Sequence, residues 1–220
     1  AKNRIFQYDA ACLVSSIYRP FTKQWLYSNR TFNEMVLQMP RIFPDASANN
    51  IVITVNAKHS GHGHIALIAN NLPDLHMNGD SQCFPLYLYG SEFNQVNEGE
   101  RRSDSPHKQT GLFPEERSDI FGVAAAHSND TTYKRRDAIT DDGLARFKAA
   151  HDGENISKED VFYYVYGLLH SPDYLERYAD NLSKELPRIP LVKTAADFWS
   201  FSQAGRELAN WHLNYETVQP

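Results

Sequence analysis

The sequence predicts an α+β fold, with a β-rich N-terminal lobe followed by a helical C-terminal lobe. Runs of β-branched and aromatic residues between turn residues dominate roughly the first 90 positions, whereas apolar residues recur with a helical period from about residue 139. Strands and helices are therefore segregated rather than alternating, which is the α+β pattern. We expect a single domain over 1–220, with the β-rich lobe in 1–130 and the helical lobe in 131–220.

Four regions of the N-terminal lobe are expected to form strands. The first region is divided by Pro20, and another is almost entirely β-branched. Pro85 favours an edge or a strand start, because proline cannot donate a hydrogen bond to a neighbouring strand. The expected strands are Ser16–Phe21 with Gln24–Tyr27, Ile51–Val55, Ile65–Ala69 and Cys83–Tyr89. The polar stretch 94–119 is expected to be a long surface loop, a type of segment that is often functional.

The helices of the C-terminal lobe are predicted from their N-caps. Thr140 precedes two acidic residues, which suit the first turn of a helix. Ser157 begins a capping-box pattern in front of an aromatic run, and Ser171 followed by Pro172 ends that helix and starts another.

A last helix is expected from about Ala195 to His212. Gly205 lies inside it, where glycine costs about 1 kcal/mol relative to alanine. We interpret this glycine as a point where another element packs closely against the helix.

Composition narrows the class of protein. The net charge of −5 argues against a protein that coats nucleic acid nonspecifically, although residues 1–60 hold seven Lys or Arg against three Asp or Glu. No apolar run reaches the roughly 18 residues of a membrane span, and no signal peptide is recognisable, so we expect a cytoplasmic protein without membrane contact. Cys12 and Cys83 are expected to be buried free thiols. The missing initiator methionine favours an excised piece.

Motifs for catalysis are absent from the sequence. It contains no CxxC pair, no GxSxG elbow and no GxxxxGK[ST] phosphate loop. Two of its three carboxylate pairs stand at predicted helix starts, where they have a structural role. We therefore expect no catalytic residue, with a stand-alone hydrolase assembled from distant His and Asp residues as an alternative.

Two sets of residues are candidates for binding. His59, His62 and His64 alternate with glycine, which favours a polar turn close to a ligand over a metal site, because no carboxylate or cysteine lies nearby. The basic clusters are Arg101-Arg102 and Lys134-Arg135-Arg136. Arginine matches a guanine edge or a phosphate, but composition alone favours ordinary solvated surface.

Four stretches together resemble the C-terminal region of type ISP restriction-modification enzymes. The first is YRPFTKQWLY (18–27), and the second is LPDLH (72–76) continuing into QCFPLY (82–87). The third is SKEDVFYYVYGLLHSP (157–172), and the fourth combines LPRIP (186–190), AGRELA (204–209) and WHLNYE (211–216). They occur in the order of the family and cover the chain nearly end to end.

The resemblance implies a non-catalytic recognition domain for double-stranded DNA. The parent enzyme would combine nuclease, translocase and adenine-N6 methyltransferase domains, with S-adenosylmethionine, ATP and Mg²⁺ as its cofactors and none in this fragment. The chain lacks the NPPY-type tetrapeptide of the methyltransferase as well as a Walker A loop. It would therefore present the target adenine to the adjacent methyltransferase domain, which flips the base.

We expect the residues that read the DNA bases to lie in the polar stretches outside the family-like motifs, because loops on a scaffold usually carry variable contacts. Base contacts are expected from Arg101, Arg102, Lys134, Arg135 and Arg136, with Lys58, His59 and His62 as secondary contacts. Arg19 and Lys23 are expected, by analogy, to support the methyltransferase junction. The alternative is a protein-docking module that couples methyltransferase and translocase through exposed aromatic residues without reading bases.

Overall fold

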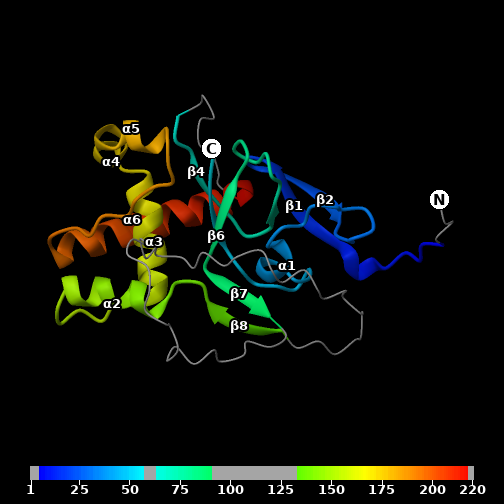
Figure 1. The fold of residues 1–220 in the computed structure, drawn as a ribbon, viewed down its shortest axis with the longest axis horizontal. Coiled ribbons are helices and arrows are strands. Elements are labelled where there is room, and N and C mark those ends of the chain that lie inside the picture. Colours follow the sequence, from blue (N-terminus) through cyan, green and yellow to red (C-terminus); the bar gives the residue numbers. More distant parts are fainter. Residues whose placement is uncertain (1–4, 57–62, 91–132, 218–220) are drawn as a thin grey trace, which may run out of the picture.

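The computed structural model describes residues 5–56, 63–90 and 133–217, and it confirms the α+β class. Most of the described strands precede residue 90, and the long helices follow residue 140 (Figure 1). The expected loop 94–119 lies outside the described residues.

The described strands form three small sheets. The first has the order β2-β1-β5, the second β4-β3-β6, and β7 pairs with β8 in the third. All pairs are antiparallel except β1 with β5. The strands are β1 Leu13–Arg19, β2 Thr22–Tyr27, β3 Val52–Val55, β4 Ala66–Ala69, β5 Leu72–Pro73, β6 Gln82–Pro85, β7 Tyr87–Gly90 and β8 Lys134–Asp137.

The last expected strand of the N-terminal lobe is two strands in the structure. Leu86 separates β6 from β7, because its N–H donates to the carbonyl of Ile51 (2.9 Å) and its own carbonyl accepts from Ala138 (2.9 Å). The chain thereby leaves the second sheet and enters the β7–β8 ribbon. Pro85 lies in the edge strand β6, as expected. The ribbon joins the two sequence ranges that we assigned to separate lobes, since β8 lies beyond residue 131.

The expected N-caps are all confirmed. Thr140 and Ser171 accept from the backbone N–H groups of Gly143 and Tyr174, and Ser157 forms a complete capping box with Asp160. The helices are α1 Met39–Ile42, α2 Asp141–Ala150, α3 Lys158–Leu169, α4 Pro172–Arg177, α5 Ala179–Leu182 and α6 Ala195–Leu213, with short 3-10 turns at Ala10–Cys12 and Tyr215–Thr217. The four-residue helix α1 was not predicted.

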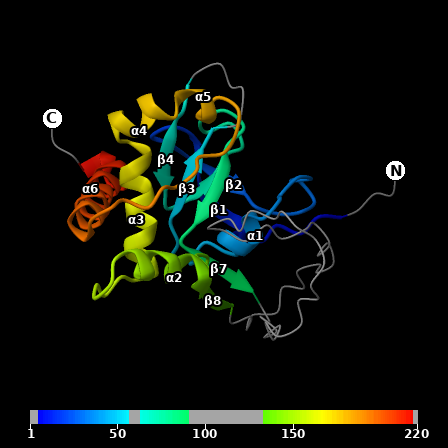
Figure 2. The same ribbon diagram turned by 60° about the vertical axis from the view of Figure 1, so that its left-hand side comes forward.

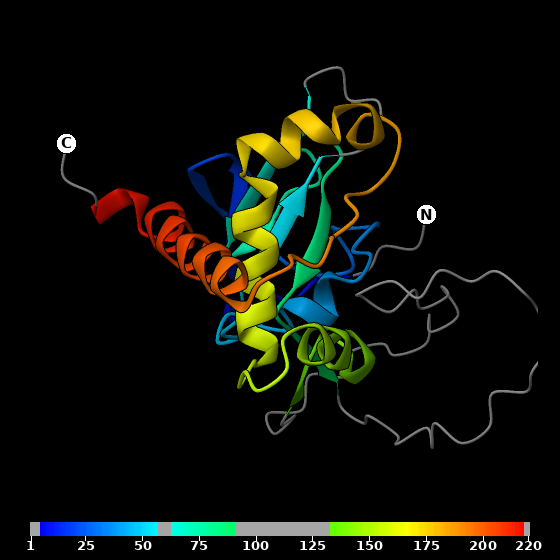
Figure 3. The ribbon, with the colours of Figure 1, turned by 90° about the vertical axis from the view of Figure 1, so that its left-hand side faces the viewer.

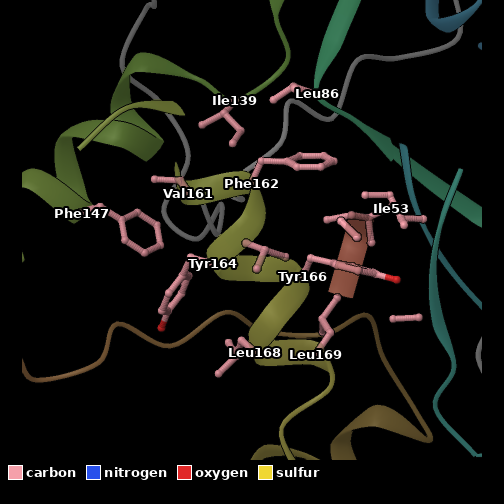
Figure 4. Close-up of a cluster of buried hydrophobic side chains, with 14 of the residues drawn as sticks. Ile53, Leu86, Ile139, Phe147, Val161, Phe162, Tyr164, Tyr166, Leu168 and Leu169 are labelled. Atoms are coloured by element: carbon pink, nitrogen blue, oxygen red, sulfur yellow. The ribbon is translucent and has the colours of Figure 1, made fainter. Parts of the chain in front are cut away.

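Helix α3 lies at the centre of the main core. Its buried side chains extend toward Phe147 of α2 on one side and toward Ile53 of β3 on another (Figure 4). The Tyr164 ring stacks on Phe198 of α6 at 5.1 Å between ring centroids, and the Tyr164 hydroxyl donates to the Pro190 carbonyl (2.7 Å). This core therefore joins the helices to the second sheet.

Helices α3 and α6 cross at two glycines (Figure 3). A Cβ atom on Gly205 would overlap the Tyr163 carbonyl oxygen and lie 2.8 Å from the Gly167 nitrogen. A Cβ on Gly167 would overlap the Phe201 carbonyl oxygen in the same way. The interpretation of Gly205 as a close-packing position is thus confirmed, and its partner is the backbone of α3.

Two further observations concern the class of protein. Among the described residues, no helix combines the length and apolar character needed to cross a membrane. Cys12 and Cys83 are free thiols, with Cys12 buried and Cys83 half-buried.

Replacing Gly205 with alanine is expected to destabilise the chain by about 3 kcal/mol or more, because overpacking here would push α6 away from α3. The usual effect of Gly→Ala inside a helix is stabilisation by about 1 kcal/mol, so the sign of the change is diagnostic. Chemical denaturation followed by circular dichroism would measure it. Ser200→Ala, at an exposed position of the same helix, should change stability by less than about 0.5 kcal/mol. A stabilised Gly205→Ala variant would contradict the close contact.

Candidate nucleic-acid interface

The basic run 134–136 forms strand β8 of the ribbon. Gly90 pairs with Lys134, Tyr89 with Arg135 and Leu88 with Arg136. Because side chains alternate along a strand, Arg135 shares one face with Tyr89, whereas Lys134 and Arg136 share the other with Leu88.

Both faces of the ribbon contact a core, but its three cations differ in burial. Leu88 packs against the smaller core cluster around Ile17 and Met77, whereas Tyr87, on the opposite face, packs against the main core. Arg136, on the face of Leu88, is half-buried, and its Nε atom is fully covered, while Lys134 and Arg135 are exposed. The strand therefore divides the three cations that the sequence presents as one cluster.

Arg135 lies over a fixed aromatic ring. Its guanidinium carbon is 4.1 Å from the centroid of the Tyr87 ring. The Tyr87 backbone is held by the side chain of Asn50, which accepts from the Tyr87 N–H (3.1 Å) and donates to the Tyr87 carbonyl (2.8 Å). Asn50 is only 1% exposed. Arg135 thus lies over a ring whose backbone is held in place by two hydrogen bonds.

Lys158 of α3 lies close to two carboxylates, one at the end of β8 and one at the start of α2. Lys158 lies 2.6 Å from the carboxylate of Asp141 and 3.6 Å from that of Asp137. The hydrogen bond from Lys158, together with its charge, lowers the pKa of Asp141. Within the described ranges, by contrast, no carboxylate forms an ion pair with Lys134 or Arg135. Among the described residues, Lys134 and Arg135 are therefore not neutralised, while Asp137 at the end of the same strand lies near Lys158.

The other expected readout residues lie outside the described residues, and they stay predictions: Arg101, Arg102, Lys58, His59 and His62. The residues that flank 57–62 are well fixed, since Asn56 donates to the Gly63 carbonyl (2.6 Å) and accepts from the Ile65 N–H (2.8 Å). Figures 1 and 2 show that this flank and the β7–β8 ribbon lie at opposite ends of the molecule.

The two expected junction residues have partners within the domain. Arg19 donates to the His76 carbonyl (2.8 Å) and lies 3.8 Å from the Asp74 carboxylate. Lys23 forms a 2.6 Å ion pair with Glu216, which follows the last long helix. In this structure both cations attach the β1–β2 hairpin to other parts of the domain.

Exposed aromatic residues gather near the N-terminus. Phe6 contacts both Tyr27 and Phe32 edge-on, at 5.7 and 4.6 Å between ring centroids, and Tyr8 stacks on Tyr27 at 5.5 Å. Trp25 lies on the same strand face as Tyr27 and is 72% exposed, while Phe32 is 62% exposed. We call these five residues the N-terminal aromatic face. The sequence indicated exposed aromatic residues as a possible docking surface but did not identify these five.

Of the three histidines that the sequence groups together, His64 lies among the described residues. It lies near His170 of the helical lobe, whose ring centroid is 5.8 Å from that of His212, and the Tyr166 hydroxyl is 2.5 Å from Nδ1 of His212. No three potential metal ligands converge in the described part of the chain. The histidine–carboxylate pair found there, His76 with Asp80, is exposed, so the described residues offer no support for the hydrolase alternative.

The comparison with protein families and the comparison with solved structures indicate the same family. The sequence profile of the type ISP C-terminal specificity domain matches residues 1–220. Among solved structures, the chain is similar to the ATP-dependent type ISP restriction-modification enzyme LlaBIII bound to DNA, with a TM-score of 0.72 and 29% identity over 98% of this chain and 12% of that chain. A search of curated proteins gave no match.

Two further solved structures resemble the chain to a similar degree. The DrdV–DNA complex has a TM-score of 0.74 and 31% identity, covering 98% of this chain and 17% of that chain. A nuclease-deletion mutant of the type ISP enzyme LlaGI, in complex with a DNA substrate mimic, has a TM-score of 0.66 and 30% identity, covering all of this chain and 15% of that chain. The chain thus spans less than a fifth of each of these three proteins.

The buried histidines predict a loss of stability in acid. Burial, followed by the charges of His212 and His64, lowers the pKa of His170 from 6.5 to about 4. Between these two pH values the unfolded chain binds a proton at this histidine and the folded chain does not. The contribution of neutral His170 to the free energy of unfolding is therefore fully present above pH 6.5 and is lost as the pH drops toward 4. For His170→Phe, the slope of the unfolding free energy against pH should be smaller than in the wild type by up to one proton. Chemical denaturation at several pH values would measure this slope.

The exposed His76 provides the control for this experiment. His76→Asn removes a histidine whose side chain is 59% exposed, and it controls for the loss of an imidazole at the surface. A wild-type slope in His170→Phe would show that His170 is not held neutral.

Proposed function

The chain belongs to the family of type ISP C-terminal specificity domains, and we propose that it recognises a specific double-stranded DNA sequence for a larger restriction-modification enzyme. The main support is that three similar structures, which match nearly the whole chain, were solved with DNA or a DNA mimic. Because the matching family model describes a specificity domain, we assign the chain the role of a recognition module without catalysis of its own.

Base readout is proposed for the basic residues predicted from the sequence. The primary set is Arg101, Arg102, Lys134, Arg135 and Arg136, and the secondary set is Lys58, His59 and His62. Of these, the exposed and unneutralised Arg135 and Lys134 have support from the described structure. The net charge of −5 fits a domain that contributes base contacts while other parts of the enzyme grip phosphates.

We further propose that the N-terminal aromatic face contacts the methyltransferase domain of the same polypeptide. Exposed aromatic clusters commonly mark protein interfaces, where tyrosine, tryptophan and phenylalanine are enriched. Arg19 and Lys23 then act by fixing the β1–β2 hairpin, which carries Trp25 and Tyr27. We assign S-adenosylmethionine, ATP and Mg²⁺, which the family implies for the parent enzyme, to its other domains, and place the enzyme in the cytoplasm.

A selection from random duplex DNA at low salt tests the recognition function. The full-length enzyme should enrich one asymmetric sequence. A version with alanine at all five primary positions should lose that enrichment but keep weak, salt-sensitive binding, because phosphate contacts remain elsewhere. Enrichment of the same sequence by the alanine variant would reject the readout residues. Failure of a folded wild-type enzyme to enrich any sequence would favour the docking module that reads no bases.

The aromatic face gives a separate prediction. Trp25→Ser in the full-length enzyme should slow adenine methylation about tenfold without changing which DNA sequence is selected, because it weakens the contact between domains rather than the contact with bases. Leu191→Ser is the matched control, since Leu191 is also an exposed apolar residue but lies far from the aromatic face in sequence, in the link between α5 and α6. Equal methylation rates in wild type and Trp25→Ser would argue against this docking surface.

A further inference from the structure

We propose that the β7–β8 ribbon enters the major groove of the target DNA and that Tyr87 positions Arg135 to read a guanine. This inference rests on the proposed recognition function and assigns one base contact within it. Tyr87 was not among the residues that the sequence indicated.

The ribbon has a suitable form and place. It consists of two antiparallel strands without a third partner among the described residues, and the major groove accepts a two-stranded ribbon of this kind. Figures 1 and 2 show it at the lower edge of the molecule, away from the first sheet's hairpin. Its exposed strand β8 begins with Lys134 and Arg135, whose charges no described carboxylate neutralises.

Arg135 is held in advance of binding. The Tyr87 ring packs against the main core, and the Arg135 guanidinium carbon lies 4.1 Å from the ring centroid. Asn50 fixes the Tyr87 backbone by two hydrogen bonds, and it also donates to the Ile42 carbonyl (3.0 Å). A guanidinium above a ring keeps its N–H donors at the edge, where they match the O6 and N7 acceptors of guanine.

Lys134 and Arg136 differ from Arg135 in orientation or burial, so within the basic set proposed above we keep Arg135 as the residue that reads a base and give the other two supporting roles. Arg136 lies on the same strand face as Leu88 and is half-buried, with its Nε atom fully covered. Lys134 is exposed on the face opposite to Arg135, and none of the described aromatic rings lies under it, so it suits a phosphate, which needs charge rather than a fixed fork. Only Arg135 combines exposure with a fixed orientation among these three.

Binding of full-length enzyme variants to the selected site, and to single-base variants of that site, tests the proposal. Arg135→Ala and Arg135→Lys should both weaken binding to the selected site about tenfold or more, with the preference for guanine lost at one position only. Tyr87→Leu should weaken binding about threefold to fivefold and relax the same position, while the salt dependence stays unchanged because no charge is removed. Tyr87→Phe keeps the ring and should behave as wild type.

Lys134→Ala is the matched control on the same strand. It should weaken binding to all site variants equally and lower the salt slope by about one. The proposal is overturned if Arg135→Lys binds as wild type does, because a phosphate contact would tolerate that change. It is also overturned if Tyr87→Leu, folded by circular dichroism, leaves the guanine preference intact. An enzyme that selects no sequence in the first place would instead reject the recognition function itself.

Discussion

The fold depends on the direct contact between the backbones of α3 and α6 at Gly167 and Gly205. No side chain separates the helices there, so they come close enough for Ser202 to donate to the Asp160 carbonyl (3.0 Å). Arg206 then reaches the carboxylates of Glu159 (2.8 Å) and Asp160 (2.7 Å). The main core forms around this pair of helices, and Tyr87 packs against that core. The glycine contact between α3 and α6 thus helps to fix the position of the Tyr87 ring, which lies under the Arg135 guanidinium.

Features set by neighbouring residues were predictable from the sequence, and features set by distant partners were not. The caps at Thr140, Ser157 and Ser171 involve side chains that bond to N–H groups three residues away, so the local pattern is sufficient. The break at Leu86 was missed because its bonding partners, Ile51 and Ala138, lie far away in sequence. Close packing at Gly205 was predicted, but the identity of its partner helix depends on tertiary structure.

The same distinction applies to the candidate site. The run 134–136 was recognised as basic, but not as part of a strand. Strand β8 has only four residues, too few for an alternating pattern to reveal it, so its two faces were not foreseen. Tyr87 becomes relevant only through strand pairing across more than forty residues. His64 was grouped with His59 and His62 by spacing, whereas tertiary structure sets it near His170.

The pairing of Gly90 with Lys134 bears on how long the connection between them can be. These residues end the described part of one strand and begin the next, so the ribbon is held by its own ladder and by Asn50, whatever sequence joins them. Doubling the length of such a connection costs only about 0.6 kcal/mol in chain entropy. A longer connection between residues 90 and 134 would therefore cost the fold little, provided that the Gly90–Lys134 pairing and the Asn50 hydrogen bonds to Tyr87 are kept.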